Sequence, residues 1–145
     1  MKSLYGMPGI IRVDHIGVAV QDLDAAINWY SVFLGGVLLS REINKEQMIE
    51  EATLELGGTH FQIISPSGDL SPIKKFLSTR GEGLQQIAFQ VANLESAIMY
   101  ANEMGVQVIF DSPKIGTGGS RINFLHPKDC FGMLIELVEL VQSEK

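Results

Sequence analysis

Two adjacent glutamines, Gln85 and Gln86, stand at the start of a segment that otherwise has the composition of a buried strand, GLQQIAFQV (residues 83–91). An uncharged carboxamide on the wall of an apolar core must find a polar partner, because leaving it unpaired costs about 1–3 kcal/mol. The pair therefore indicates that a polar object is bound at this position.

An internal repeat gives Gln86 three companions. The segments VDHIGVAVQDLDAAI (residues 13–27) and LQQIAFQVANLESAI (residues 84–98) align without a gap at an offset of 71 residues. This alignment places His15 opposite Gln86, and a slightly different offset matches Gln62 in FQII with Glu136 in IELV. One imidazole, two amides and one carboxylate thus occupy two pairs of equivalent positions, and all four are potential cation ligands.

The elements that must position these side chains follow one order twice. In the first module, strands are expected at residues 10–20, 37–43, 50–56 and 59–65, with a helix at 22–33. In the second module, strands are expected at 83–91, 107–110, 121–125 and 133–140, with a helix at 94–104. Asp22 is the candidate N-cap of the first helix, and Gly57-Gly58 is a two-residue hairpin signal. A linker at residues 67–82 contains a short helical piece around Ile73–Leu77.

This order predicts an α+β fold made of two βαβββ modules within one domain, residues 11–142. The modules are expected at about 11–66 and 83–140, side by side in a curved, half-open mixed β-barrel. Alternate residues of a strand point to opposite faces, so His15 and Gln86 fall on the faces turned away from the helices. Glu51 points the same way as His15, because Ala52 and Leu54 form the apolar face of their strand. The candidate site lies on this concave face.

Composition excludes several classes of protein. The net charge is −6 and no Lys/Arg cluster forms the basic stripe of a nucleic-acid binder. No apolar run approaches the roughly 20 residues of a membrane span, so we expect a cytoplasmic protein. The single cysteine, Cys130, cannot form an internal disulfide.

Five segments in order show a family resemblance: DHIGVAV, EQMIEEATLELG, GEGLQQIAFQV, GTGGSRINFLHPKD and LIELVE. From about Val13 to Leu140 they resemble the methylmalonyl-CoA epimerases, a family of the vicinal oxygen chelate group, which includes glyoxalase I and extradiol dioxygenases. The resemblance implies the vicinal oxygen chelate fold, a homodimer and a catalytic glutamate at Glu51. It also implies metal ligands, at His15, Gln62, Gln86 and Glu136.

The chain departs from the family pattern at two places. Many of these epimerases have His-His where this chain has Gln85-Gln86, so an amide replaces one imidazole ligand. Met48 stands where the family usually has glycine after Glu-Gln.

The implied ligand set is rich in oxygen and contains no thiolate, which suits Co²⁺, Mn²⁺, Ni²⁺ or Mg²⁺ better than a closed structural zinc site. With a single anionic ligand the ion keeps a net positive charge, and it can attract an anionic substrate that chelates through two oxygens. We therefore expect a metal-dependent epimerase of methylmalonyl-CoA, or of a similar 2-carboxyacyl-CoA, which moves the α-proton through a metal-stabilised enolate. Glu51 would be the general base, and Glu136 or a metal-bound water is the candidate for the second acid.

Several residues are expected to contact the acyl-CoA substrate. Either one of the cations Arg121 and Lys128 meets the substrate carboxylate or a phosphate of coenzyme A, or both are ordinary loop residues. Gly118 and Gly119, in the GTGG segment, are expected either to close over the ligand or simply to form a turn.

Two other functions fit the same fold. One is a glyoxalase I-type isomerase acting on a glutathione hemithioacetal, and the other is a metal-free, resistance-type protein that binds a small aromatic compound. The HPKD segment and the segment around Glu51 favour an acyl-thioester substrate over a glutathione hemithioacetal. The complete ligand set and the few aromatic residues argue against the second.

Overall fold

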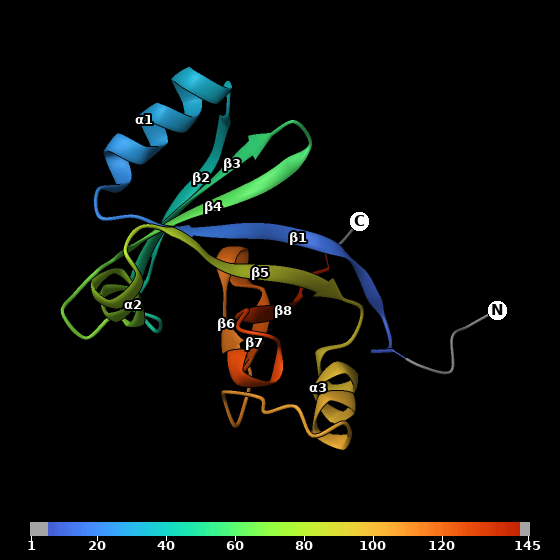
Figure 1. Cartoon of the computed structure of the whole chain (residues 1–145). Helices are drawn as coiled ribbons and strands as arrows, with labels where there is room; N and C mark the ends of the chain where they lie inside the picture. The colour runs from blue at the N-terminus through green and yellow to red at the C-terminus, as the bar shows by residue number, and fades with distance from the viewer. Residues whose placement is uncertain (1–5, 143–145) are drawn as a thin grey trace. The chain divides into compact units, whose positions relative to one another are not determined.

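The computed structural model describes residues 6–142, which fall into two compact units. One unit is Asp14–Gln86, and the other combines residues 6–13 with the chain from Ile87 onward. The strands are β1 (Ile10–Ala19), β2 (Val37–Asn44), β3 (Ile49–Leu56), β4 (Thr59–Pro66), β5 (Gly83–Val91), β6 (Lys114–Ile115), β7 (Arg121–Leu125) and β8 (Ile135–Glu139) (Figure 1). The helices are α1 (Leu23–Leu34), α2 (Pro72–Arg80) and α3 (Leu94–Glu103), with short 3-10 helices η1 (Thr117–Gly119) and η2 (Pro127–Asp129).

In the Asp14–Gln86 unit, the strands are hydrogen-bonded in the order β2-β3-β4-β1. The β2–β3 and β3–β4 pairs are antiparallel, whereas β1 runs parallel to β4. Helix α1 lies along one face of these strands, where it packs on Val18, Leu54 and Ile63 (Figure 1). Helix α2 packs on the opposite face, against residues such as Ala19 and Ile64.

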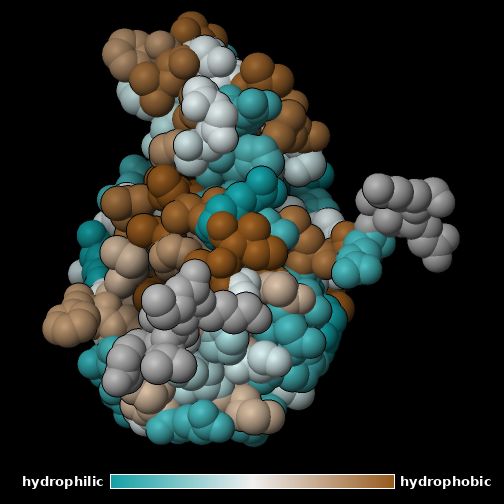
Figure 2. Space-filling model, turned by 90° about the vertical axis from the view of Figure 1, so that its right-hand side faces the viewer, coloured by the Kyte–Doolittle hydropathy of each residue, from teal (hydrophilic) through white to brown (hydrophobic). Residues whose placement is uncertain are grey.

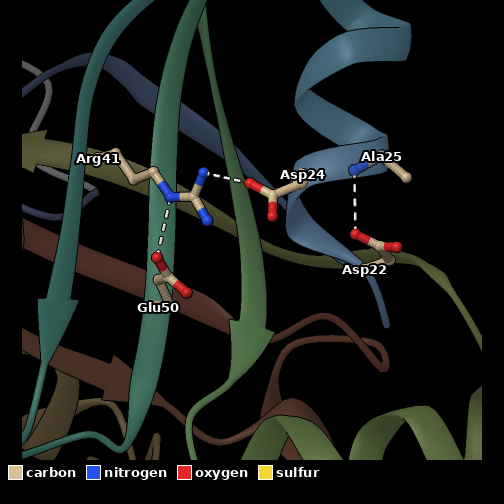
Figure 3. Close-up of polar contacts among 5 residues, drawn as sticks. All are labelled: Asp22, Asp24, Ala25, Arg41 and Glu50. Atoms are coloured by element: carbon tan, nitrogen blue, oxygen red, sulfur yellow. Dashed lines mark hydrogen bonds and ion pairs between the residues drawn. The ribbon is translucent and has the colours of Figure 1, made fainter.

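The turns and helix ends of this unit follow from local sequence. Asp22 is the N-cap of α1, as predicted, because its Oδ1 accepts a hydrogen bond of 3.0 Å from the Ala25 N–H (Figure 3). The hairpin between β3 and β4 turns at Gly57 and Gly58, both at positive φ (55° and 86°). The predicted helical piece in the linker is the full helix α2, capped by Ser71.

The second unit repeats the order of elements. From Ile87 onward its strands are hydrogen-bonded in the order β5-β8-β7-β6, with β5 parallel to β8 and the other pairs antiparallel. Helix α3 packs on one face, against Val91 and Leu137. The opposite face is formed by Ala88, Phe124 and Val138. A βαβββ order therefore occurs twice along the chain.

One predicted strand, at residues 107–110, is wrong. Only an isolated bridge forms there, between Val108 and Leu125, and the strand next to β7 is instead the two-residue β6. The reason is a side chain: the buried amide of Asn123 accepts from the Phe110 N–H (3.1 Å) and donates to the Phe110 carbonyl (3.0 Å). The ladder stops because a side chain occupies the backbone groups that a strand would offer to its neighbour.

The outer side of α1 exposes large apolar side chains. Trp29 and Phe33 stack with their ring centroids 4.9 Å apart, and Val32 beside them is also exposed. Figure 2 shows hydrophobic surface at the top of the molecule, where α1 lies. Within residues 6–142, no helix has both the length and the apolar character needed to cross a membrane.

Candidate functional site

The face of the Asp14–Gln86 unit that looks away from α1 contains a group of buried polar side chains. Gln62 on β4 is in register with Gly17 on β1 and with Thr53 on β3, so all three point the same way. Glu51, two residues before Thr53, shares this side, as predicted from strand parity. The buried polar side chains of this face are His15, Glu51, Thr53, Gln62 and Gln86.

His15 and Gln86 are brought together across 71 residues of sequence. The Nε2 atom of His15 lies 3.3 Å from the amide nitrogen of Gln86. Gly17 makes this approach possible, because a Cβ built on Gly17 would lie only 2.5 Å from the Cγ of Gln86. The side chain of Gln86 therefore runs across the bare backbone of β1, which is one reason for a glycine inside a strand.

The other ring nitrogen of His15 contacts Asp14. Its Nδ1 lies 2.8 Å from the Asp14 Oδ2, and both side chains are shielded, with 5% of His15 and 17% of Asp14 exposed. Sequence reasoning missed Asp14, because strand parity places neighbouring residues on opposite faces. The available signal was an acidic residue directly before the candidate ligand in DHIG.

Glu51 differs sharply from its acidic neighbours. Arg41 Nε donates to the Glu50 Oε2 (2.9 Å), and Arg41 also binds Asp24 of α1, so Glu50 is held beside α1 (Figure 3). The pKa of Arg41 is raised by these hydrogen bonds, from Asp24 first and then from Glu50. Glu55 is exposed, whereas only 3% of Glu51 is exposed. Glu51 is thus the buried carboxylate of β3.

Thr53 is a second residue of this face that sequence reasoning did not select. Its hydroxyl oxygen is buried and has no hydrogen-bond partner among the described residues. The same is true of the Gln85 Oε1 and of the Gln90 Oε1 in the second unit. Such groups are rare in folded proteins, and each calls for a partner that a ligand or water can supply.

In the second unit, Glu136 is buried on the face of the sheet opposite α3. It lies in register with Ala88 on β5 and with Phe124 on β7, and 5% of it is exposed. A carboxylate inside an apolar strand is costly unless it has a polar or cationic partner. This environment agrees with a ligand role for Glu136, which stays a prediction.

The predicted substrate contacts also lie in this unit. Arg121 Nη1 donates to the Glu139 Oε2 (2.8 Å) and Nη2 donates to Glu95 of α3. The hydrogen bond from Arg121 is the main reason why the pKa of Glu95 is lowered. Two carboxylates thus compensate the charge of Arg121, whereas Lys128 is exposed and forms no ion pair with any described residue.

The glycines of the GTGG segment form the tight turn η1. Gly118 and Gly119 have φ values of 64° and 79°, in the left-handed region that favours glycine. Both are exposed, so the turn is accessible from solvent. Their predicted contact with the substrate stays a prediction.

The donor set can be tested against the predicted cation. The described residues contain no cluster of three or more His, Cys, Asp or Glu side chains that could hold a metal. The predicted set differs from such clusters, because half of it is glutamine. Since Nδ1 of His15 faces a carboxylate, Nε2 is the nitrogen that can bind a metal, and it points to Gln86. An imidazole beside a carboxamide, which can turn to offer its oxygen, fits a divalent ion of the kind expected from the sequence.

Comparison with known proteins agrees with this fold. A family model described as the Glyoxalase/Bleomycin resistance protein/Dioxygenase superfamily matches residues 14–124, so the chain belongs to this superfamily. The crystal structure of methylmalonyl-CoA epimerase from Mycobacterium tuberculosis has 41% sequence identity and a TM-score of 0.90, over 96% of this chain and 94% of that one. Within the superfamily, the chain belongs to the methylmalonyl-CoA epimerase family.

Two further relatives support this assignment. The mitochondrial methylmalonyl-CoA epimerase of Mus musculus is 34% identical over 87% of this chain and 71% of its own length. A methylmalonyl-CoA epimerase solved in complex with methylmalonyl-CoA and NH4+ is 39% identical, with a TM-score of 0.88, over 93% of this chain and 98% of that one. The predicted fold class and the predicted enzyme class, an epimerase-like isomerase, are thereby confirmed.

Proposed function

We propose that this enzyme interconverts the two epimers of methylmalonyl-CoA, or of a similar 2-carboxyacyl-CoA, with Glu51 as the base that removes the α-proton. The burial of Glu51 on the polar face that also contains His15 and Gln62 is the observation that carries the proposal. The names of the relatives support the substrate class, and one of them was solved with methylmalonyl-CoA bound.

The chemistry explains why a buried carboxylate is needed. The α-carbon lies between a thioester carbonyl and a carboxylate, and its C–H bond breaks when Glu51 accepts the proton. The electron pair moves onto the thioester oxygen, giving a planar enolate. Returning a proton to the opposite side inverts the centre, and we propose Glu136 as the second acid. General acid–base steps of this kind typically contribute about 10²–10⁴-fold to the rate.

We also propose that a divalent cation, Co²⁺, Mn²⁺, Ni²⁺ or Mg²⁺, belongs to this site. Its ligands would be His15, Gln62, Gln86 and Glu136, and when bound it would supply Lewis-acid stabilisation of the developing negative charge. Two of these four ligands, Gln62 and Gln86, are neutral amides. Because Gln62 and Gln86 carry no charge, they would hold the ion without reducing its attraction for an anionic substrate.

The anionic groups of acyl-CoA need partners on the protein. Lys128 is the readier of the two predicted cations, because it is exposed, while Arg121 would first have to leave Glu95 and Glu139. The exposed turn at Gly118 and Gly119 is proposed to close beside the bound substrate.

Proton exchange tests the proposal directly. Racemic methylmalonyl-CoA is incubated in D₂O with the wild-type enzyme, and the loss of the α-proton signal is followed by NMR. We expect Glu51→Gln to slow exchange by about 10²–10⁴-fold for the epimer whose α-proton Glu51 removes, since it removes the proton acceptor but keeps the size of the side chain. The other epimer can still exchange through Glu136, so about half of the α-proton signal should persist. Glu55→Gln, the same change at an exposed position of the same strand, should exchange at the wild-type rate. Near-normal exchange of both epimers by the Glu51→Gln enzyme would assign the proton to another group.

The homodimer and the cytoplasmic location remain predictions. The exposed Trp29, Val32 and Phe33 on α1 provide apolar surface that a second copy could cover. Sedimentation of the wild type and of a Phe33→Glu variant would test this: a dimer that persists in the variant would exclude α1 as its interface.

A further inference from the structure

We infer that Asp14 is a positioning residue for His15: its carboxylate fixes the imidazole in one tautomer, with the proton on Nδ1 and the lone pair of Nε2 directed into the site. The inference rests on the proposed function in one respect, since it takes Nε2 as a cation ligand. The contact itself, 2.8 Å between Nδ1 and the Asp14 Oδ2, is independent of that function.

The chemistry of the two partners determines which nitrogen carries the proton. An ionised carboxylate only accepts hydrogen bonds, so Nδ1 must be the donor in this contact. The distance lies within the 2.7–2.9 Å typical of charge-assisted bonds. In a neutral imidazole the other nitrogen is then an acceptor, and Nε2 indeed faces the amide nitrogen of Gln86 at 3.3 Å. The two contacts of the ring agree on one tautomer.

The fold explains why the ring needs such a restraint. Pairing of β1 with β4 begins at Ile16, so Asp14 and His15 precede this part of the ladder. Gly17, two residues further on the same face, offers no side chain against which the imidazole could pack. Asp14 supplies a fixed partner for the ring within β1, just before the pairing with β4 begins.

The expected effect is a change in cation affinity rather than in fold. Carboxylates that orient a metal-binding histidine typically contribute about 10–100-fold to metal affinity. Asp14→Ala should lower the affinity for Co²⁺ by this amount. Asp14→Asn should lower it less, because its amide oxygen can still accept the Nδ1 proton but carries no charge.

The experiment uses the full chain, stripped of metal, with two readouts. Co²⁺ affinity is measured by calorimetric titration, and the tautomer of His15 is read from imidazole ¹⁵N shifts without metal. A His15→Ala variant assigns the signals, since the chain has only 3 histidines. Asp24→Ala is the matched control, because it removes a carboxylate that binds Arg41 beside α1 (Figure 3). We expect the wild type and this control to show the Nδ1-protonated form and equal affinity, and Asp14→Ala to show mixed tautomers.

The outcomes separate this inference from the proposed function. If His15→Ala loses Co²⁺ affinity but both Asp14 variants stay within twofold of the wild type, Asp14 has no positioning role. If the wild type shows no His15-dependent Co²⁺ binding, the proposed cation is wrong, and the tautomer alone decides on Asp14: unchanged ¹⁵N shifts in its variants overturn the inference. If Asp14→Ala does not fold, the Asp14→Asn chain decides by the same two criteria.

Discussion

Gly17→Ala is the substitution that should disturb the site most directly without touching a polar group. Gly17 lies on β1 beneath the side chain of Gln86. Its φ is not in the left-handed region, so an added Cβ would cause a steric clash but no backbone strain. An added Cβ would lie 2.5 Å from the Cγ of Gln86, 3.1 Å from its Cδ and 3.2 Å from its Nε2. The first of these distances is shorter than real carbon contacts allow.

The size of the effect follows from these distances. Ordinary contact begins near 3.4 Å, so Cγ of Gln86 must retreat by about 1 Å. Cγ is close to the backbone, so the whole amide must turn away and lose its contact with His15. Overpacking of this kind costs about 1–3 kcal/mol of the free energy of unfolding. A misplacement of about 1 Å in a catalytic site can cost about 10²-fold in rate.

Urea unfolding and the D₂O exchange assay measure the two effects. Gly68→Ala is the matched control, since its added Cβ meets nothing within 4 Å, and it should change neither quantity. A double-mutant cycle sharpens the test: in a Gln86→Ala background, Gly17→Ala should cost less than about 0.5 kcal/mol, because the clash has been removed. A Gly17→Ala enzyme as stable and as active as the wild type would show that Gln86 does not need the space above Gly17.

Three further predictions concern single residues. Met48 has a φ of 56°, so we expect Met48→Val to lower the free energy of urea unfolding by about 1–3 kcal/mol, whereas Met48→Gly should stay within about 1 kcal/mol of the wild type. Thr53→Val should raise the free energy of urea unfolding by about 1 kcal/mol, because the substitution removes a buried hydroxyl without a partner. A lower free energy of unfolding in this variant would indicate a bound water at the hydroxyl. The pKa of Cys130 is raised, chiefly by burial and then by Asp129, so iodoacetamide should modify it more slowly near neutral pH than in the urea-unfolded chain; equal rates would contradict this.

The faces of the strands could be predicted from the sequence because they follow from strict alternation. Ala52 and Leu54 on one side of β3 assign Glu51 to the other, and the register with β4 agrees. The repeat at an offset of 71 residues could likewise be found by alignment, and it led to His15 and Gln86, which the structure brings within 3.3 Å. Both signals can be detected in the sequence alone, so they require no knowledge of tertiary contacts.

The features that were missed depend on what two side chains do when they meet. Asp14 binds His15 although parity separates them, and Asn123 replaces a strand ladder at Phe110 with its own amide. Neither contact follows from a period of two, since each requires a side chain to reach a specific atom. Met48 was recognised in part. The sequence showed that methionine stands where the family pattern has glycine, and the positive φ of Met48 explains why glycine is favoured at this position.

The amide at position 86 has a consequence that an imidazole there would not share. A carboxamide carries a donor and an acceptor on one planar group, so it can donate to the Nε2 of His15 and, after a half-turn, offer its oxygen to a cation. A neutral imidazole presents either a donor or a lone pair at a given nitrogen, and changing between them requires a different tautomer. With Asp14 holding the proton of His15 on Nδ1, the acceptor at Nε2 is constant, and Gln86 is the partner that can adapt. The replacement of histidine by glutamine is therefore compatible with cation binding, because the fixed tautomer of His15 and the adaptable amide of Gln86 complement each other.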